Sequence, residues 1–394
     1  MLRTDSPCDG CGPAAAPRGG WTLRRPAAHG LAALAAVLLA APSCAALPMQ
    51  RVCVAPDGRG FVLAPSRQPF TPWGHNYASC NIEESWDKDW SIIARDFAEM
   101  KKLGATVARV HLQFPRFMDG PDKPNARSLK QLARLLGIAE KTGVYLDITG
   151  LACYNPKERA AWYDNLSDQD RWTVQARFWE AVAATCASSP AVFCYDLMNE
   201  PVAGARNEGG WYGGRLGGYD FLQWLFLARK DLPREELARQ WCHTLATAIR
   251  KHDPHHLITV GLLPPLNGKY FFGFVPEKIA PELDFIAVHI YPKAGKVDEA
   301  LRDLKLFLVP GKPLIVEETF PLSCGTAELR QFLLESRGTA CGWIGHYLKE
   351  TPEELVALRQ AGKITIAQAI LLSWLDLFRD LGPQMLGRDA PGKP

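Results

Sequence analysis

The sequence predicts an α/β fold, a closed (β/α)8 or TIM barrel preceded by an N-terminal β-hairpin. Short, nearly continuous apolar runs alternate with amphipathic helical segments, which is typical of a parallel sheet whose strands are buried on both faces. Eight such runs occur along the chain. The Gly-x-Gly-x-x-Gly motif of open nucleotide-binding sheets does not follow the first of them. These observations favour a closed barrel over an open, doubly wound sheet.

The expected elements follow one another without an internal repeat or linker. The chain begins with a hairpin at Arg51–Leu63 around Asp57-Gly58, a strong two-residue turn signal. The expected strands are Phe70–Tyr77, Ala105–Leu112, Val144–Thr149, Val192–Pro201, Leu257–Leu262, Leu283–Tyr291, Leu314–Glu318 and Thr339–Tyr347. The expected helices are Ile92–Leu103, Leu129–Lys141, Gln169–Cys186, Glu235–His252, Val297–Leu306, Ala327–Leu334 and Leu355–Leu381.

The chain is expected to consist of three segments: a leader at 1–46, one catalytic domain at 47–388, and a C-terminal tail at 389–394. Arg24-Arg25 precede the uncharged run Leu31–Ala41, and small residues follow it, which is the pattern of an export signal. A membrane-spanning helix would need about 20 apolar residues, and Pro42 ends this run early. The sequence therefore predicts a periplasmic or extracellular protein. Lipid anchoring at Cys44 is a minor alternative.

Charge and cysteine content agree with an ordinary exported globular domain. Without the leader, 41 basic and 40 acidic residues remain, so the chain lacks the basic footprint of a nucleic-acid binder. Eight cysteines remain beyond Cys44, an even number that permits disulfides in an exported protein. Sequence alone does not give their pairing.

Carboxylic acids stand at the ends of two buried strands. The run Val192–Pro201 finishes in Asn199-Glu200-Pro201, and about 120 residues later another strand ends in Glu317-Glu318. In an α/β barrel the carboxyl ends of the strands carry the catalytic groups. Two carboxyl groups, one acidic and one ionised, are what glycosidic bond cleavage requires.

The Asn-Glu-Pro strand, with matching strands before and after it, resembles the retaining (β/α)8 glycoside hydrolases of clan A, most closely family 5, the cellulases and mannanases. The resemblance covers roughly residues 52–347. It implies that the hairpin caps the bottom of the barrel, that Glu200 is the acid/base, and that Asn199 binds the sugar 2-hydroxyl. Within the glutamate pair it assigns the nucleophile to Glu318, with Glu317 on the opposite strand face as a structural partner.

Three further residues match supporting positions of that family. Arg109 lies in the middle of a buried strand, where an unpaired cation would cost several kcal/mol, roughly, in lost solvation. The resemblance implies that it keeps the nucleophile ionised; the alternative is a structural pair with Asp147 or Asp196. His289 and Tyr291 match the His-x-Tyr pair that orients the nucleophile, although a lone histidine in a core strand is usually structural.

The chain also departs from the family pattern. Thr149 ends the third strand where a histidine is common, and His346 stands where a tryptophan usually lies under the reacting sugar. His346 and Trp343, three residues earlier, are nevertheless expected to support substrate binding. Aromatic residues in loops after the strands are candidates for stacking on sugars: Trp86, Trp162 and Trp211.

These features predict a secreted retaining β-glycosidase that hydrolyses a β-linked polysaccharide, with β-1,4-glucan or β-mannan as first candidates. A non-catalytic glycan-binding barrel is the alternative, and transglycosylation by the same acids stays open. The sequence contains neither a His-Glu-x-x-His nor a Gly-x-Ser-x-Gly motif. We therefore expect no metal and no cofactor, a monomer whose partner is an oligo- or polysaccharide, and no binding to nucleic acid or, beyond the export signal, to membranes.

Overall fold

The computed structural model describes residues 48–77, 82–204, 210–228, 231–269 and 271–387. The predicted leader and tail lie outside these residues. Pro48–Pro394 forms one compact unit, and the account below concerns this unit.

Eight parallel strands close into a barrel, as the sequence predicts. Their order around the barrel is β13-β14-β15-β16-β4-β5-β8-β9, and β9 pairs with β13 to close it. The strands are β4 (Trp73–Tyr77), β5 (Val107–Gln113), β8 (Tyr145–Ala152), β9 (Val192–Asn199), β13 (Leu257–Leu262), β14 (Ile286–His289), β15 (Leu314–Glu318) and β16 (Trp343–Tyr347). All eight carboxyl ends therefore meet at one mouth, where the acids of the sequence converge.

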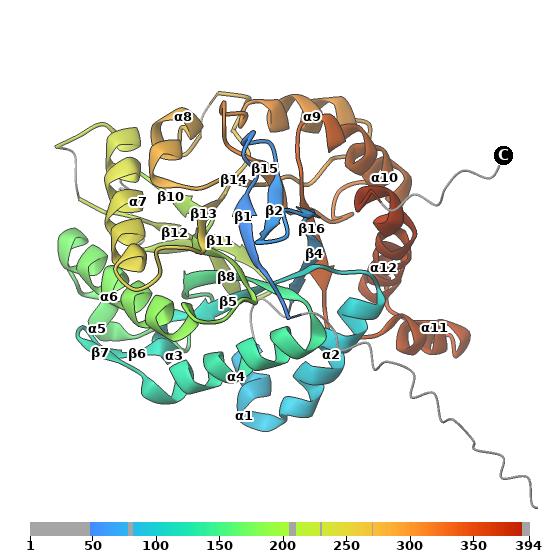
Figure 1. Ribbon diagram of the computed structural model, residues 1–394, viewed down its shortest axis with the longest axis horizontal. Helices are drawn as coiled ribbons and strands as arrows, with labels where there is room; N and C mark the ends of the chain where they lie inside the picture. Colours follow the sequence, from blue (N-terminus) through green and yellow to red (C-terminus); the bar gives the residue numbers. More distant parts are fainter. Residues whose placement is uncertain (1–47, 78–81, 205–209, 229–230, 270, 388–394) are drawn as a thin grey trace, which may run out of the picture. The chain divides into compact units, whose positions relative to one another are not determined.

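A three-stranded antiparallel sheet closes the opposite end of the barrel. It consists of β1 (Arg51–Val54), β2 (Phe61–Ala64) and β3 (Pro69–Phe70), and β1 and β2 lie across the barrel's centre in Figure 1. Phe61 packs edge-on against Phe193 and Phe285 inside the barrel, with ring centroids 5.2 Å apart in each case. These aromatic contacts remove the lower half of the barrel interior from water, which confirms the predicted hairpin cap.

Helices surround the strands in a ring (Figure 1). The longer ones are α2 (Trp90–Lys102), α4 (Ala126–Thr142), α6 (Asp168–Cys186), α7 (Arg234–Arg250), α9 (Val297–Lys305), α10 (Thr326–Glu335), α11 (Pro352–Gln360) and α12 (Ile366–Met385). Shorter ones are α1 (Ile82–Lys88), α3 (Phe114–Phe117), α5 (Ala161–Asp164) and α8 (Pro276–Ile279). Helix α4 shows why the boundaries fall where they do. The Asn125 side chain accepts a hydrogen bond from the Ser128 N–H, and Gly143 ends the helix with φ of 65°.

The structure differs from the expected elements in three places. A second small sheet follows the catalytic strand: β10 (Pro201–Val202), β12 (Tyr219–Trp224) and β11 (Tyr212–Leu216). The last predicted helix is two helices, because Gly362, with φ of 66°, ends α11 before Thr365 caps α12. Two-stranded β6 (Met118–Gly120) and β7 (Lys123–Pro124) form a further small pair.

The described cysteines are free thiols, at positions 53, 153, 186, 194, 242, 324 and 341. Within the described residues, no helix combines the length and apolarity that crossing a membrane would require.

Candidate active site

Arg109 on β5 is fully buried and lies at the centre of the site. One guanidinium nitrogen donates to Glu318 at 2.5 Å and to Asn76 at 2.8 Å. The other donates to Asp196 at 2.7 Å and to the Asn199 side-chain oxygen at 3.2 Å. Burial alone would lower the pKa of Arg109, but the surrounding carboxylates raise it well above its ordinary value. This guanidinium is therefore a fixed positive charge beneath the barrel mouth.

Glu200 directly follows β9, Glu318 ends β15 three positions further round the barrel, and the two approach each other closely. A carboxylate oxygen of each, with a ring nitrogen of His289, forms a group whose atoms all lie within 4.8 Å of one another. Retaining glycosidases place their two carboxyl groups about 5–5.5 Å apart, whereas inverting enzymes need about 6.5–9.5 Å to admit a water molecule. The short separation matches the retaining geometry. Both side chains keep limited access to solvent, with 16% and 12% exposed.

The surroundings of Glu318 keep it ionised. Burial raises the pKa of this carboxyl, but the charges of His289 and Arg109 outweigh burial and lower the pKa far below its ordinary range. Tyr291 donates its hydroxyl to the other carboxylate oxygen of Glu318 at 2.6 Å. An ionised carboxylate held by donors on both oxygens is the state that a nucleophile requires.

His289 at the end of β14 contacts Glu200 and Glu317, and its Nδ1 also lies 3.6 Å from Glu318. Its Nδ1 lies 2.9 Å from Glu200, and its Nε2 lies 3.3 Å from Glu317. Burial lowers the pKa of His289, but the charge of Glu318 and the hydrogen bonds to Glu200 and Glu317 raise it to about 10 in total. The imidazole is therefore protonated at neutral pH and is a second cation of the site.

The raised pKa of His289 predicts how stability depends on pH. A protonated histidine with a raised pKa stabilises the fold fully below about 6.5, and this stabilisation is lost as the pH rises through about 10. We expect the free energy of unfolding to fall between pH 7 and 10 more steeply in the wild-type protein than in His289→Asn. Urea unfolding across this range measures both slopes, and equal slopes would show that His289 is not the titrating group.

His346 on β16 contacts the hydroxyl of Tyr291 through Nε2 at 3.0 Å. Because Tyr291 already donates its proton to Glu318, the His346 Nε2–H is the donor in this contact. Burial lowers the pKa of His346, so the ring is neutral. The chain Glu318–Tyr291–His346 thus fixes the nucleophile position from the side where the family pattern has a tryptophan.

Glu317 lies inside the barrel and not on the opposite strand face, so that prediction was wrong. Ile315 and Glu317 face the interior, whereas Leu314 and Val316 pack against the helices. A register shift pairs Val288 with Val316 but His289 with Glu318. Glu317 shares the interior face of Ile315, and this irregularity turns Glu318 toward the barrel axis as well. Glu317 lies 3.6 Å from Arg109.

A layer of buried acids supports the site from below. Asp196 accepts from Arg109, from the Thr149 hydroxyl at 2.7 Å and from the Gly261 N–H at 2.8 Å. Asp147 has its pKa raised well above the ordinary value by burial and by the charge of Glu317. The raised pKa favours the neutral form of Asp147. Gly261 is required at this level, since a Cβ there would lie 2.7–2.9 Å from Glu317, His289 and Arg109.

Comparison with known proteins identifies the family. The family model for cellulase, glycosyl hydrolase family 5, matches residues 66–263, half of the chain. The chain belongs to glycosyl hydrolase family 5. It is therefore a glycoside hydrolase of the retaining type, which agrees with the short distance between Glu200 and Glu318.

Mannan-degrading enzymes are among the relatives of this family 5 enzyme. A protein of Aspergillus terreus named probable mannan endo-1,4-β-mannosidase C is 22% identical over 314 residues, covering 67% of this chain and 70% of that one. The structure of an exo-β-1,4-mannosidase from Opitutaceae bacterium strain TAV5 matches with a TM-score of 0.61 at 18% identity, covering 85% of this chain. This chain spans only 63% of that mannosidase. A β-1,4-mannanase from the sea hare Aplysia kurodai matches with a TM-score of 0.58 at 16% identity, covering 84% and 96% of the two chains. At these identities the structural matches support the (β/α)8 fold.

Three buried residues of the family 5 site were missed from the sequence: Asn76, His111 and Tyr154. His111 contacts the Tyr154 hydroxyl at 2.7 Å and the Asn76 oxygen at 3.2 Å. Burial and the charge of Arg109 lower the pKa of His111, so it is neutral. Strand alternation could have indicated it, because His111 is two residues after Arg109 and shares its face. Asn76, a polar residue at the end of a buried strand, carried a similar signal.

Most of the tryptophans predicted to contact sugars do not face the site. Trp343 starts β16 at the closed end of the barrel and donates to the Ser336 hydroxyl, so its assignment to substrate binding is corrected. Trp86 is 4% exposed and stacks on Trp90. Trp211 is equally buried and donates to the Asp164 carbonyl. Trp162 is half-buried beside Phe114, and its contact with sugar stays a prediction.

Two groups of side chains in the described residues, one of two glutamates and a histidine and one of three carboxyls, have the spacing of metal ligands. They are Glu200, His289 and Glu318, and Asp147, Asp196 and Glu317. In the first group the protonated His289 is itself a cation. In the second, the Arg109 guanidinium lies 2.7 Å from Asp196 and 3.6 Å from Glu317, in the position where a cation would bind. Cationic side chains thus neutralise both groups.

Proposed function

We propose that this family 5 enzyme hydrolyses internal or terminal β-1,4 linkages of a β-mannan or β-glucan, with mannan as the first candidate. The observation that carries the proposal is the short distance between Glu200 and an ionised Glu318. The mannan-acting relatives favour mannan over glucan. A non-catalytic glycan-binding barrel is disfavoured, because both carboxyl groups are present together with the cations that keep Glu318 ionised.

The proposed mechanism is a double displacement. Glu318 attacks the anomeric carbon and forms a glycosyl-enzyme ester while Glu200 gives its proton to the departing oxygen. Glu200 then takes a proton from water, which attacks the same carbon and releases Glu318. Asn199 precedes Glu200 and accepts a hydrogen bond from Arg109, and the family resemblance assigns its side chain to the sugar 2-hydroxyl. Tyr291 and His346 hold Glu318 in line for both steps.

A polysaccharide screen tests the function. Wild-type enzyme is incubated with β-1,4-mannan, carboxymethyl cellulose and xylan, and new reducing ends are measured. Glu200→Gln, prepared identically, controls for contaminating hydrolases. We expect release from mannan or glucan by the wild type alone. Binding to these polymers without any product would instead support a non-catalytic module.

We also propose that residues 1–46 direct export and are then removed, with a monomeric enzyme as the product. The basic pair and uncharged run of the leader support this. N-terminal sequencing of secreted protein is expected to give a start near Ala45–Leu47. A secreted chain that retains Met1, or one found only in the cytosol, would contradict this.

A further inference from the structure

The small sheet that follows Glu200 reaches the catalytic centre. Strand β10 begins directly after Glu200 and runs parallel to β12, with Pro201 opposite Gln223. Asn199 ends β9 two residues before Pro201 and contacts Phe221 of β12. The Asn199 amide donates to the Phe221 carbonyl at 3.2 Å, while its oxygen accepts from Arg109. The hairpin β11–β12 is therefore joined to the residue expected to bind the reacting sugar.

One face of β12 points toward the barrel mouth. Alternate residues of a strand share a face, so Tyr219, Phe221 and Gln223 project together. The Gln223 amide donates to the Leu151 carbonyl near the end of β8. The Phe221 ring packs 4.9 Å from that of Tyr154, whose hydroxyl contacts His111 in the site. Tyr219 and Phe221 have ring centroids 6.4 Å apart, and both are only half-buried. They present aromatic surface on the strand whose Phe221 carbonyl accepts from Asn199.

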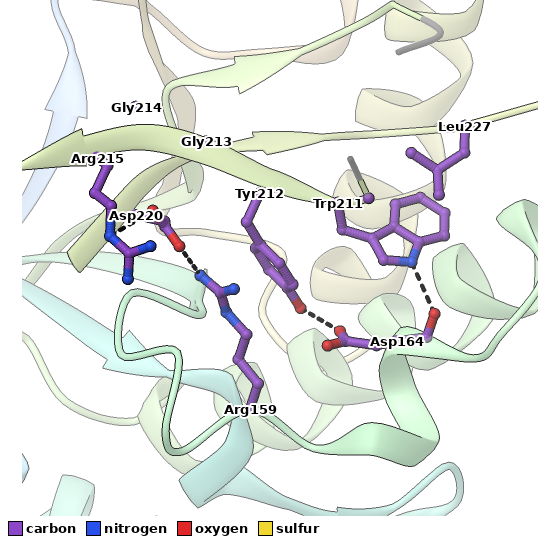
Figure 2. A pocket seen from close by; sticks show the side chains of 10 residues that line it. Arg159, Asp164, Trp211, Tyr212, Gly213, Gly214, Arg215, Asp220 and Leu227 are labelled. Carbon is purple, nitrogen blue, oxygen red and sulfur yellow. Dashed lines mark hydrogen bonds and ion pairs between the residues drawn. The ribbon is translucent and has the colours of Figure 1, made fainter. Parts of the chain in front are cut away.

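The hairpin is also fixed to the loop after β8 by other side chains (Figure 2). Arg159 rises from this loop, donates to Asp220 at 2.5 Å and covers the ring of Tyr212 at 3.7 Å. The Tyr212 hydroxyl donates to Asp164 at 2.5 Å, and the Trp211 indole donates to the Asp164 carbonyl. These contacts hold Trp211 and Tyr212 against the loop.

The tip of the hairpin is a tight turn. Gly217 and Gly218 have φ of 58° and 90°, which is the conformation of a two-residue turn that matches the twist of paired strands. Tyr219 follows this turn directly. An aromatic side chain on a fixed hairpin loses little conformational freedom when a ligand binds.

We propose that Tyr219 and Phe221 form a sugar-binding subsite in which a pyranose ring of the β-linked substrate stacks beside Asn199. A β-pyranose presents C–H groups on its faces and hydroxyls at its edge, so an aromatic wall next to amide and hydroxyl groups fits it. On β16, His346 stands where the family pattern has a tryptophan under the sugar. Tyr219 and Phe221 supply the apolar contact that this tryptophan gives. The inference rests on the proposed glycosidase function and names where the saccharide lies.

Calorimetry with a substrate that cannot be cleaved tests the subsite. Mannohexaose and cellohexaose are titrated into full-length Glu200→Gln enzyme and into the same protein carrying Tyr219→Leu, Tyr219→Phe or Phe221→Leu. We expect roughly tenfold weaker binding for the leucine variants, the size of one aromatic contact, and nearly unchanged binding for Tyr219→Phe. In the active background, Tyr219→Leu should raise KM about tenfold with a smaller effect on kcat.

Leu222→Ala is the matched control, since Leu222 projects from the opposite face of β12 and packs beside Gly214. It should leave affinity unchanged even if it lowers the melting temperature. Equal affinity of Tyr219→Leu, Phe221→Leu and their parent would overturn the subsite while leaving the glycosidase function intact. If the parent binds neither saccharide and the wild type cleaves neither, the proposed function fails and the subsite fails with it.

Discussion

Glu318→Ala is expected to lose hydrolysis by about 10⁴-fold or more, because removal of a nucleophile abolishes the covalent step. The hole that the alanine leaves can admit azide, which attacks the sugar once from the face that Glu318 occupied. An aryl β-glycoside with a good leaving group should then give an inverted, α-glycosyl azide. Glu200→Ala should still form the glycosyl-enzyme ester with the same substrate, and azide should release a retained, β-glycosyl azide. Nuclear magnetic resonance of the two products distinguishes the anomers.

Glu317→Gln is the matched control for this experiment. It changes a neighbouring carboxyl that also lies close to Arg109 and His289 but is completely buried. Azide should give no product with this variant. If Glu317→Gln or Glu317→Ala yields the inverted azide, the nucleophile is Glu317 rather than Glu318. If no variant of the three acids yields an azide, the double displacement itself is refuted.

The sequence predicts most of this site because the fold concentrates strand ends. Glu200 and Glu318 each end a buried parallel strand, and a closed barrel brings all such ends to one mouth. Arg109 was recognisable because a charge in the middle of a buried strand needs partners. The same reasoning would have found His111, two residues further on the same face.

That both Glu317 and Glu318 point into the barrel was not predictable in this way. Strict alternation assigns the two glutamates to opposite faces, and the register shift between β14 and β15 cancels that assignment. Such a shift depends on the pairing of strands that are distant in sequence. The predicted sugar contacts of the tryptophans failed for a related reason. Whether Trp86 or Trp211 can contact a sugar depends on which side chains cover it, and some of these come from parts of the chain distant in sequence. The hairpin β11–β12 lies in a glycine-rich segment, where composition indicates a loop.

Arg109→Lys is expected to fold and to lose at least about 10²-fold in kcat, the size of one lost electrostatic contact in the transition state. Lysine keeps the charge but replaces a planar fork with a single ammonium group. It can approach Glu318 or Asp196 but cannot reproduce the paired bonds to both. Glu318 would then be less firmly held, and the loss should appear in kcat more than in KM, because Arg109 contacts the nucleophile and not the sugar.

Steady-state kinetics on an aryl β-glycoside and thermal unfolding, measured together, separate this effect from misfolding. Arg239→Lys is the control, since Arg239 on α7 pairs with Glu236 and Glu282 at the surface and should leave kcat unchanged. Burial raises the pKa of Glu318, but the charges of His289 and Arg109 outweigh burial and lower it. A lysine that fits the site less closely should therefore move the acidic limb of the kcat/KM profile to higher pH. A folded Arg109→Lys enzyme with near-normal kcat and an unmoved acidic limb would show that Arg109 is a structural partner of Asp196 alone.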